Sequence, residues 1–113
     1  EVMNGVSVVV SAITVADADA LRTAADQVRD RLTDGAVLLA AETDGKLIFV
    51  AMATPSAVKK GIHSGNIIRE AAKTAGGGGG GRPDMAQAGG KDASKLADAL
   101  EAAKNTIKAQ LGV

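Results

Sequence analysis

Six consecutive glycines, Gly76 to Gly81, followed at once by Arg82 and Pro83, form the segment most suited to chemistry. Glycine adopts either sign of φ, so such a run can turn successive backbone N–H groups toward one anion. The Arg82 guanidinium would add two hydrogen bonds to a phosphate. The composition is also typical of a flexible linker. The apolar helix patterns on both sides and the stiff Pro83 favour an ordered anion-binding loop, a glycine nest.

Two common phosphate motifs do not fit this segment. A dinucleotide fingerprint needs its glycines between a strand and a helix, whereas a helix pattern precedes Gly76 and Pro83 follows the run. The phosphate loop of nucleotide hydrolases ends in Gly-Lys-Ser/Thr, and here the run ends in Gly81-Arg82-Pro83. The expected anion is therefore a phosphate or the backbone of an RNA.

Cationic side chains gather around the glycines. Residues 1–45 hold eight acids and three bases, while residues 46–113 hold ten bases and five acids. We therefore expect a polyanion to meet the second half of the chain. The alternative is a solvated surface with no partner. The candidate RNA-binding residues are Arg82, Lys59, Lys60, Arg69, Lys73, Lys91 and, for a base or ribose edge, Gln87.

The sequence contains little that could catalyse a reaction. His63 is the only histidine and there is no cysteine, which excludes disulfides, thiolate metal sites and a Cys-His nucleophile pair. We expect His63 to stand at the start of a helix. Asp84 is expected to act as a turn residue or as the ion-pair partner of Arg82. No catalytic residue and no metal ligand is predicted.

The hydrophobic periodicity predicts a single α/β domain over residues 1–113, with a mixed parallel and antiparallel sheet covered by helices. The Asp44-Gly45 pair between two apolar runs predicts a hairpin, and the unit before it a right-handed parallel crossover. The glycine-rich loop is expected between the last two helices. The predicted elements are a strand over Val6–Val15, a helix from Asp17 or Asp19 to Asp34, strands over Val37–Ala41 and Leu47–Ala53, a helix opened by Ser64 or Asn66, and a helix from Asp92 with Leu96, Leu100, Ala103, Ile107 and Leu111 on one stripe.

Composition restricts the function further. The chain has 113 residues with 46% apolar residues, one Phe and no Tyr or Trp, so it lacks aromatic platforms for stacking splayed bases. No apolar run reaches the length of a membrane span and no signal peptide opens the chain, which predicts a cytoplasmic module without a membrane partner. The first residue is Glu1, which suggests a domain excised from a longer protein.

The segment from Gly76 to Gly90, GGGGGGRPDMAQAGG, resembles the signature near the end of bacterial alanyl-tRNA synthetases. The stretch Lys60 to Gly65 and, further on, Asp92 with Leu96 and Leu100 stand in matching places. The resemblance covers essentially the whole chain. It points to the C-terminal C-Ala domain, which is related to the accessory domain that follows DHH phosphoesterases. Gly78 departs from the pattern, because many members carry a lysine there.

The resemblance implies a non-catalytic domain that binds tRNA(Ala) near its elbow and helps one tRNA serve both the aminoacylation and the editing sites. Its partners would be the catalytic and editing domains of a parent class II alanine–tRNA ligase, and a second copy through an upstream helical segment. No cofactor is expected in this chain. The ATP, Mg and Zn of the parent enzyme would bind outside it.

Two alternatives remain open from the sequence. One is the nucleic-acid or nucleotide-binding accessory domain of a DHH phosphoesterase, although the glycine motif of that family typically ends in His where this chain has Arg82. The other is a dimerisation or scaffold module. The residues upstream of Glu1 would separate the first alternative from the synthetase.

Overall fold

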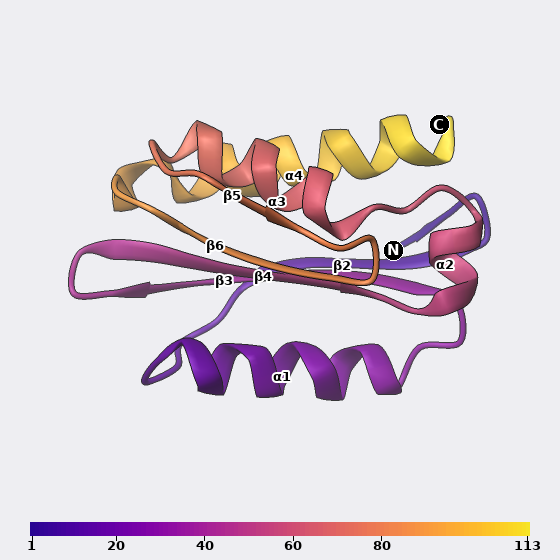
Figure 1. Ribbon diagram of the computed structural model, residues 1–113, viewed down its shortest axis with the longest axis horizontal. Helices are drawn as coiled ribbons and strands as arrows, with labels where there is room; N and C mark the ends of the chain where they lie inside the picture. The colour runs from indigo at the N-terminus through magenta and orange to yellow at the C-terminus, as the bar shows by residue number, and fades with distance from the viewer.

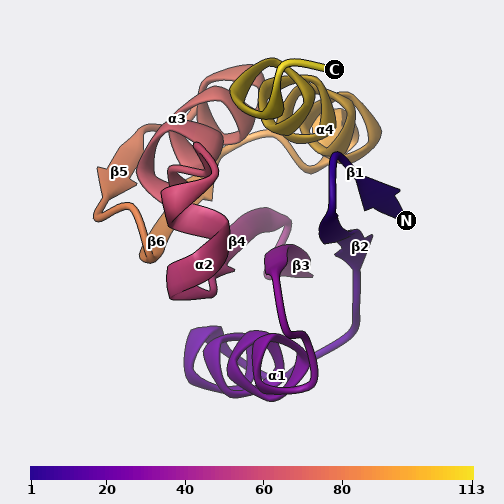
Figure 2. The ribbon, with the colours of Figure 1, turned by 90° about the vertical axis from the view of Figure 1, so that its right-hand side faces the viewer.

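The computed structural model describes residues 1–113 and shows one six-stranded sheet between two helical layers (Figures 1 and 2). The strand order is β1-β2-β3-β4-β6-β5, with β2 and β3 parallel and the other neighbours antiparallel. The predicted mixed α/β fold is therefore confirmed. The elements are β1 (Val2–Met3), β2 (Val6–Ala12), α1 (Ala18–Asp30), β3 (Gly35–Thr43), β4 (Lys46–Ala53), α2 (Pro55–Lys59), α3 (Ser64–Thr74), β5 (Gly79–Gly81), β6 (Met85–Gly90), the 3₁₀ turn η1 (Ala93–Lys95) and α4 (Leu96–Leu111).

The first parallel unit forms largely as predicted. Asp17 caps α1 by accepting a hydrogen bond from the N–H of Ala20 at 2.8 Å. β2 ends at Ala12, earlier than the predicted strand over Val6–Val15. In the β3–β4 turn, Asp44 and Gly45 have φ of 53° and 78°, the positive values that a two-residue hairpin turn of type I′ needs. The predicted hairpin is confirmed.

A short helix, α2, was not predicted. Pro55 is its first residue, where a missing N–H costs nothing, and the Thr54 side chain caps it by accepting from the N–H of Ala57. In the sequence, Pro55 indicates only the end of a strand. The cap of α3 also differs from the prediction. His63, rather than Ser64 or Asn66, caps this helix, because its Nδ1 accepts from the N–H of Asn66 at 3.1 Å.

The glycine run is not a loop throughout. Gly79–Gly81 form the edge strand β5, which pairs with β6, so a hairpin stands between α3 and η1. Of the six glycines only Gly76 has a positive φ, which rules out the alternating conformation of a nest. The nest and the flexible linker are both wrong. Glycine has a low strand propensity, so the glycine run does not indicate a strand in the sequence. Tertiary contacts stabilise the strand instead.

Glycines allow α3 and β6 to approach the run closely. A methyl group on Gly77 would lie 1.9 Å from the carbonyl oxygen of Gly89, and one on Gly65 would lie 2.3 Å from that of Gly81. The N–H of Gly65 also donates to the carbonyl oxygen of Arg82 at 3.1 Å. Side chains at these positions would force the strand away from the helix.

The core lies on both faces of the sheet. On the face covered by α3 and α4, the α3–α4 face, Phe49, Ile68 and Ile107 are fully buried with many alanines. On the opposite face, the α1 face, Leu21 and Ala25 of α1 pack against β3 and β4. In the predicted stripe of α4, Ala103, Ile107 and Leu111 are buried, whereas Leu96 and Leu100 are half-buried. No helix is both long and apolar enough to cross a membrane.

Candidate nucleic-acid interface

The two faces of the β5–β6 hairpin differ sharply. Gly79 and Gly81 pair with Ala88 and Ala86, which pack on the core of the α3–α4 face. A methyl group on Gly79 would lie 2.3 Å from the Cβ of Ala88. Successive residues of a strand face opposite sides, so Gly80 faces the α1 face, where nothing lies within 4 Å of an added methyl group. The hairpin thus exposes a surface without side chains at Gly78 and Gly80.

Arg82 lies at the turn of this hairpin, where its N–H donates to the carbonyl oxygen of Met85 at 3.0 Å. Its side chain is 72% exposed, and its Nε lies 3.5 Å from Oδ1 of Asp84. The predicted ion pair between Arg82 and Asp84 is therefore present. An exposed pair of this kind contributes little to stability, so the guanidinium is free to exchange its partner for a phosphate.

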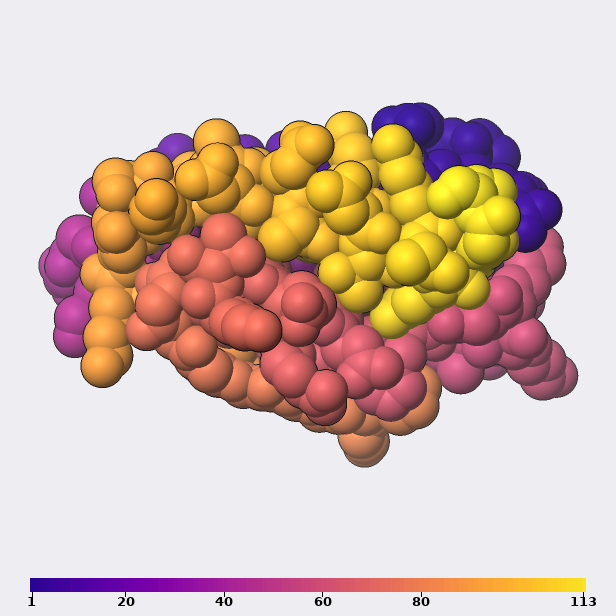
Figure 3. Space-filling model, turned by 90° about the horizontal axis from the view of Figure 1, so that it is seen from above, coloured from indigo at the N-terminus to yellow at the C-terminus, as the bar shows by residue number.

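Two of the predicted cations lie on α3, beside the glycine strand. Arg69 and Lys73 are exposed, stand four residues apart on one side of the helix, and have no carboxylate within 4 Å. Figure 3 shows α3 next to α4, with the orange atoms of the hairpin along the free edge of α3. Gly65, four and eight residues before these two cations, lies against Gly81 of β5, so Arg69 and Lys73 are on the side of α3 that is turned toward the edge strand.

The structure separates Lys59 and Lys60, which are adjacent in sequence, by their contacts. Lys59 is exposed at the end of α2 and forms no ion pair. The Nζ of Lys60 lies 3.2 Å from Oδ2 of Asp34 and 3.4 Å from the carbonyl oxygen of Gly5. The Ser56 hydroxyl and Lys60 together lower the pKa of Asp34. Lys60 is thus engaged with the N-terminal half of the chain.

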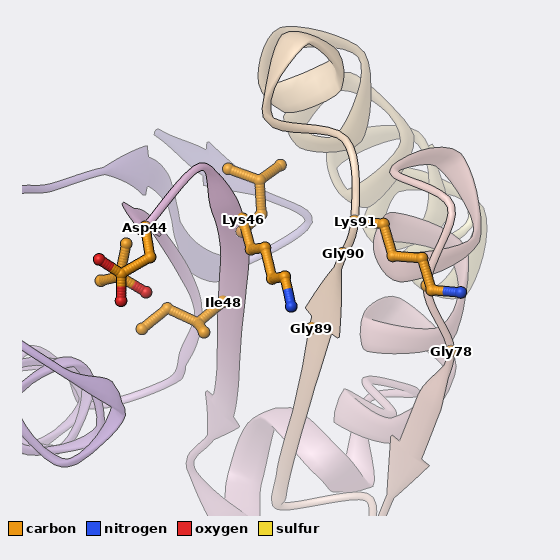
Figure 4. Close-up of a pocket in the computed structure, with 10 residues that line it drawn as sticks. Asp44, Lys46, Ile48, Gly78, Gly89, Gly90 and Lys91 are labelled. Carbon is orange, nitrogen blue, oxygen red and sulfur yellow. The ribbon is translucent and has the colours of Figure 1, made fainter.

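Lys91 follows β6 directly and lines a groove of about 510 Å³ together with Lys46 and the backbone of Gly77, Gly78, Gly89 and Gly90. In Figure 4 the Lys46 side chain extends toward Gly89, and that of Lys91 extends toward the segment of Gly78. Neither lysine has a carboxylate within 4 Å. Lys46 was not predicted, because it lies outside the cation-rich stretch of the sequence. The only feature of the sequence that pointed to Lys46 was its position directly after the Asp44-Gly45 turn, where a side chain is expected to be exposed.

Gln87 is exposed in the middle of β6 and pairs with Gly80 on one side and Val50 on the other. Since Val50 belongs to the core of the α1 face, the Gln87 side chain lies on that same face. It is therefore beside the open glycine surface.

His63 has the structural role that the sequence predicted. Besides capping α3, its backbone N–H donates to Oε1 of Gln110 at 3.0 Å, and its carbonyl oxygen accepts from Nε2 of the same residue at 3.2 Å. These bonds fasten the start of α3 to α4. No group of three or more His, Cys, Asp or Glu side chains is placed to hold a metal ion.

The geometry matches a known class of domain. The family model described as the DHHA1 domain matches residues 5–109. The chain belongs to the DHHA1 domain family. Its fold is also similar to the crystal structure of the C-Ala domain from Aquifex aeolicus alanyl-tRNA synthetase, with a TM-score of 0.76 and 31% identity over 95% of this chain and 91% of that one. Within the family it therefore stands with the C-Ala domains of alanyl-tRNA synthetases.

Longer relatives agree with this placement. The chain is 55% identical to an alanine–tRNA ligase of Acetivibrio thermocellus over 109 residues, which is 96% of this chain and 12% of that ligase. It is 51% identical to the alanine–tRNA ligase of Clostridioides difficile over 109 residues, which is again 96% of this chain and 12% of that ligase. The chain thus spans 12% of the length of these relatives. They are ligases, which favours the synthetase over the phosphoesterase alternative.

Proposed function

We propose that the chain is the C-terminal tRNA-binding domain of an alanine–tRNA ligase, and that it holds tRNA(Ala) at the elbow. The observation that carries the proposal is the exposed glycine strand β5, with Arg82 at its turn, in a chain that belongs with the C-Ala domains. A strand without side chains allows a sugar-phosphate backbone to lie directly against it. The neighbouring cations supply the charge that such a backbone needs.

Binding is expected to be electrostatic. With one Phe and no Tyr or Trp, the chain cannot use the aromatic stacking by which many domains read single strands. Phosphate contacts come instead from exposed side chains with no ion pair, such as Lys59, Arg69, Lys73 and Lys91, and from Arg82. Lys60 contributes less, because Asp34 already neutralises it. Affinity therefore depends on the shape of the tRNA and the salt concentration more than on base identity.

In the parent enzyme this domain is proposed to keep one tRNA attached while its acceptor end moves between the aminoacylation and the editing sites. The catalytic and editing domains are then its covalent partners, and a second copy joins through an upstream helical segment. The domain itself needs no cofactor for this task. ATP, Mg and Zn belong to the other domains.

The test is a titration of the 113-residue chain with tRNA(Ala) over a series of salt concentrations. If about three to five phosphates are neutralised, log affinity falls with log salt at a slope of about −2 to −5. Arg82→Ala should weaken binding by about 1–3 kcal/mol, the value of a charge-assisted contact. The matched control is Lys108→Ala, which removes an exposed cation from α4.

Two results would contradict the proposal. The first is an affinity that does not change with salt. The second is equal affinity for tRNA(Ala) and for a minihelix that carries the acceptor stem and lacks the elbow, since the elbow would then contribute nothing.

A further inference from the structure

The α1 face of the β5–β6 hairpin is not covered by a helix. α1 packs under β3 and β4, and Figure 2 shows the hairpin to one side of it. Two hollows lie along this uncovered face, one at each end of the hairpin. The two hollows share no residue, and the open α1 face of β5 and β6 lies between them. We call this surface, together with the hollow at each end, the hairpin groove.

The floor of the hairpin groove has few side chains. Met85, Gln87 and Gly89 of β6 face this side, because their partners on β4 belong to the core of the α1 face. Gly80 of β5 pairs with Gln87 and faces the same side, so two of these four positions are glycines. Added methyl groups at Gly78 and Gly80 would meet nothing within 4 Å. From Met85 to Gly89 the floor runs about 13 Å at the rise of an extended strand. This length suits a few nucleotides of backbone, with the exposed Gln87 side chain within reach of them.

Both ends of the groove carry cations. At one end are Lys46 and Lys91, which have no carboxylate within 4 Å. At the other end, a hollow of about 320 Å³ is lined by Arg22 and Arg29 of α1 and by Arg82. The carboxylates in the two hollows are those of Asp26, Asp44 and Asp84.

The arginines of α1 differ in how firmly they are held. Arg29 forms an ion pair with Asp26, and its Nη1 lies 3.7 Å from Sδ of Met52, so it is packed against the sheet. Arg22 is 44% exposed and pairs only with Asp19, whose side chain is 86% exposed. Such an exposed pair is weak, so a phosphate can replace the carboxylate. Arg22 is the arginine of α1 that is available to a ligand.

We propose that the hairpin groove is the track on which the RNA backbone lies, with Arg22 and Lys46 as phosphate contacts at its two ends. The inference rests on the proposed tRNA binding and adds the α1 face of the hairpin to the cations that α3 supplies on the other side of the edge strand. It brings residue Arg22 of the acidic first half into the site, where the charge distribution of the sequence pointed only to the second half. The cations at both ends favour a polyanion such as RNA. A protein partner is less favoured, because a glycine floor offers few apolar side chains to bury.

The experiment compares Lys46→Gln, Arg22→Gln and the double variant in the 113-residue chain, again with tRNA(Ala) over a salt series. Lys108→Gln is the matched control for the loss of one exposed cation. Each single variant should weaken binding about three- to tenfold and reduce the steepness of the salt slope by about one. The double variant should reduce the steepness of the salt slope by about two. Lys108→Gln should change neither quantity.

A second variant tests the floor without removing a charge. Gly80→Val places a branched side chain in the groove, where an added Cβ meets no atom within 4 Å. It should weaken tRNA binding about tenfold or more while the thermal melting midpoint does not fall. Ser11→Val is its control. Ser11 lies on β2, near the opposite edge of the same sheet. Its side chain is on the α1 face, because the neighbouring Val10 packs on the α3–α4 face.

The outcomes separate the two proposals. If the parent chain does not bind tRNA(Ala), the proposed function fails. If the parent chain binds and Arg82→Ala weakens binding, but all groove variants bind like the parent, the groove is overturned and the proposed function stands. Groove variants that keep their tRNA affinity but lose association with the catalytic part of the parent enzyme would assign the groove to a protein contact and would also overturn the inference.

Discussion

Adding a single methyl group to neighbouring glycines of β5 should change stability in opposite directions. At Gly79 the new Cβ would lie 2.3 Å from the Cβ of Ala88, 3.2 Å from its Cα and 3.3 Å from the carbonyl oxygen of Gln87. Carbon atoms in contact are about 3.5–4.0 Å apart, so β5 and β6 must separate by about an ångström. Overpacking of this size costs about 1–3 kcal/mol.

At Gly80 the same change meets no atom within 4 Å, and φ lies outside the left-handed region. Alanine then restricts the unfolded chain without straining the native state, which should stabilise the protein by about 0.4–1 kcal/mol. The difference between Gly79→Ala and Gly80→Ala is therefore expected to be about 1.4–4 kcal/mol.

Urea unfolding followed by circular dichroism measures this difference, because the slope with denaturant should be the same for all variants. A double variant, Gly79→Ala with Ala88→Gly, identifies the clash. If the two Cβ atoms collide, the double variant is less destabilised than the sum of the single ones, with a coupling of about 0.5–3 kcal/mol.

Equal free energies of unfolding for Gly79→Ala and Gly80→Ala would refute the reasoning. Residues of a flexible linker have no fixed neighbours, so both substitutions would then be neutral. A coupling of zero between positions 79 and 88 would likewise show that β5 does not pack on β6 in the register seen here.

Two further predictions concern the helices. Ile107→Ala should lower the free energy of unfolding by about 2–5 kcal/mol, because Ile107 is fully buried on α4. Leu100→Ala on the same stripe should lower it clearly less, because Leu100 is only half-buried. Urea unfolding measures both changes, and equal changes would contradict the packing of α4. The hydroxyl of Ser94, and then its backbone N–H, lower the pKa of Asp92, so the stabilisation by this cap is complete above the ordinary value of 3.8 and is lost as pH falls through the lower folded-state value. When the pH is lowered from about 5 to about 2, the melting temperature of Asp92→Asn in calorimetry should therefore fall less than that of the parent. An equal fall would show that this carboxylate does not contribute to stability.

Local patterns in the sequence were sufficient where a residue's role depends on its neighbours along the chain. Asp44-Gly45 predicted the β3–β4 hairpin because a tight turn needs two residues that tolerate positive φ. Asp17 predicted the start of α1 for a similar local reason, since its carboxylate reaches an N–H only three residues away. Asp84, two residues after Arg82, was predicted to be a turn residue or the ion-pair partner of Arg82, and it forms the ion pair.

The conformation of the glycines was decided by tertiary structure. A glycine run has no side chains to form a periodic pattern, so nothing in the sequence distinguishes a linker, a nest and a strand. The distinction comes from α3 and β6, whose backbones lie so close that only glycine fits at Gly65, Gly77 and Gly79. The same packing leaves Gly80 open.

The assembly of the candidate site also depends on tertiary structure. The sequence concentrates cations between Lys59 and Lys91, yet the fold draws Lys60 to Asp34 and away from a free role. It places Lys46 beside Lys91, and Arg22 in the same hollow as Arg82, although each pair is separated by more than forty residues. The sequence by itself determined the family through its resemblance to a known signature, and it determined the β3–β4 turn and most helices through short-range rules. Which cations meet on one surface was decided only by the order of the strands and the side of the sheet that α1 covers, because both arise from packing between distant segments.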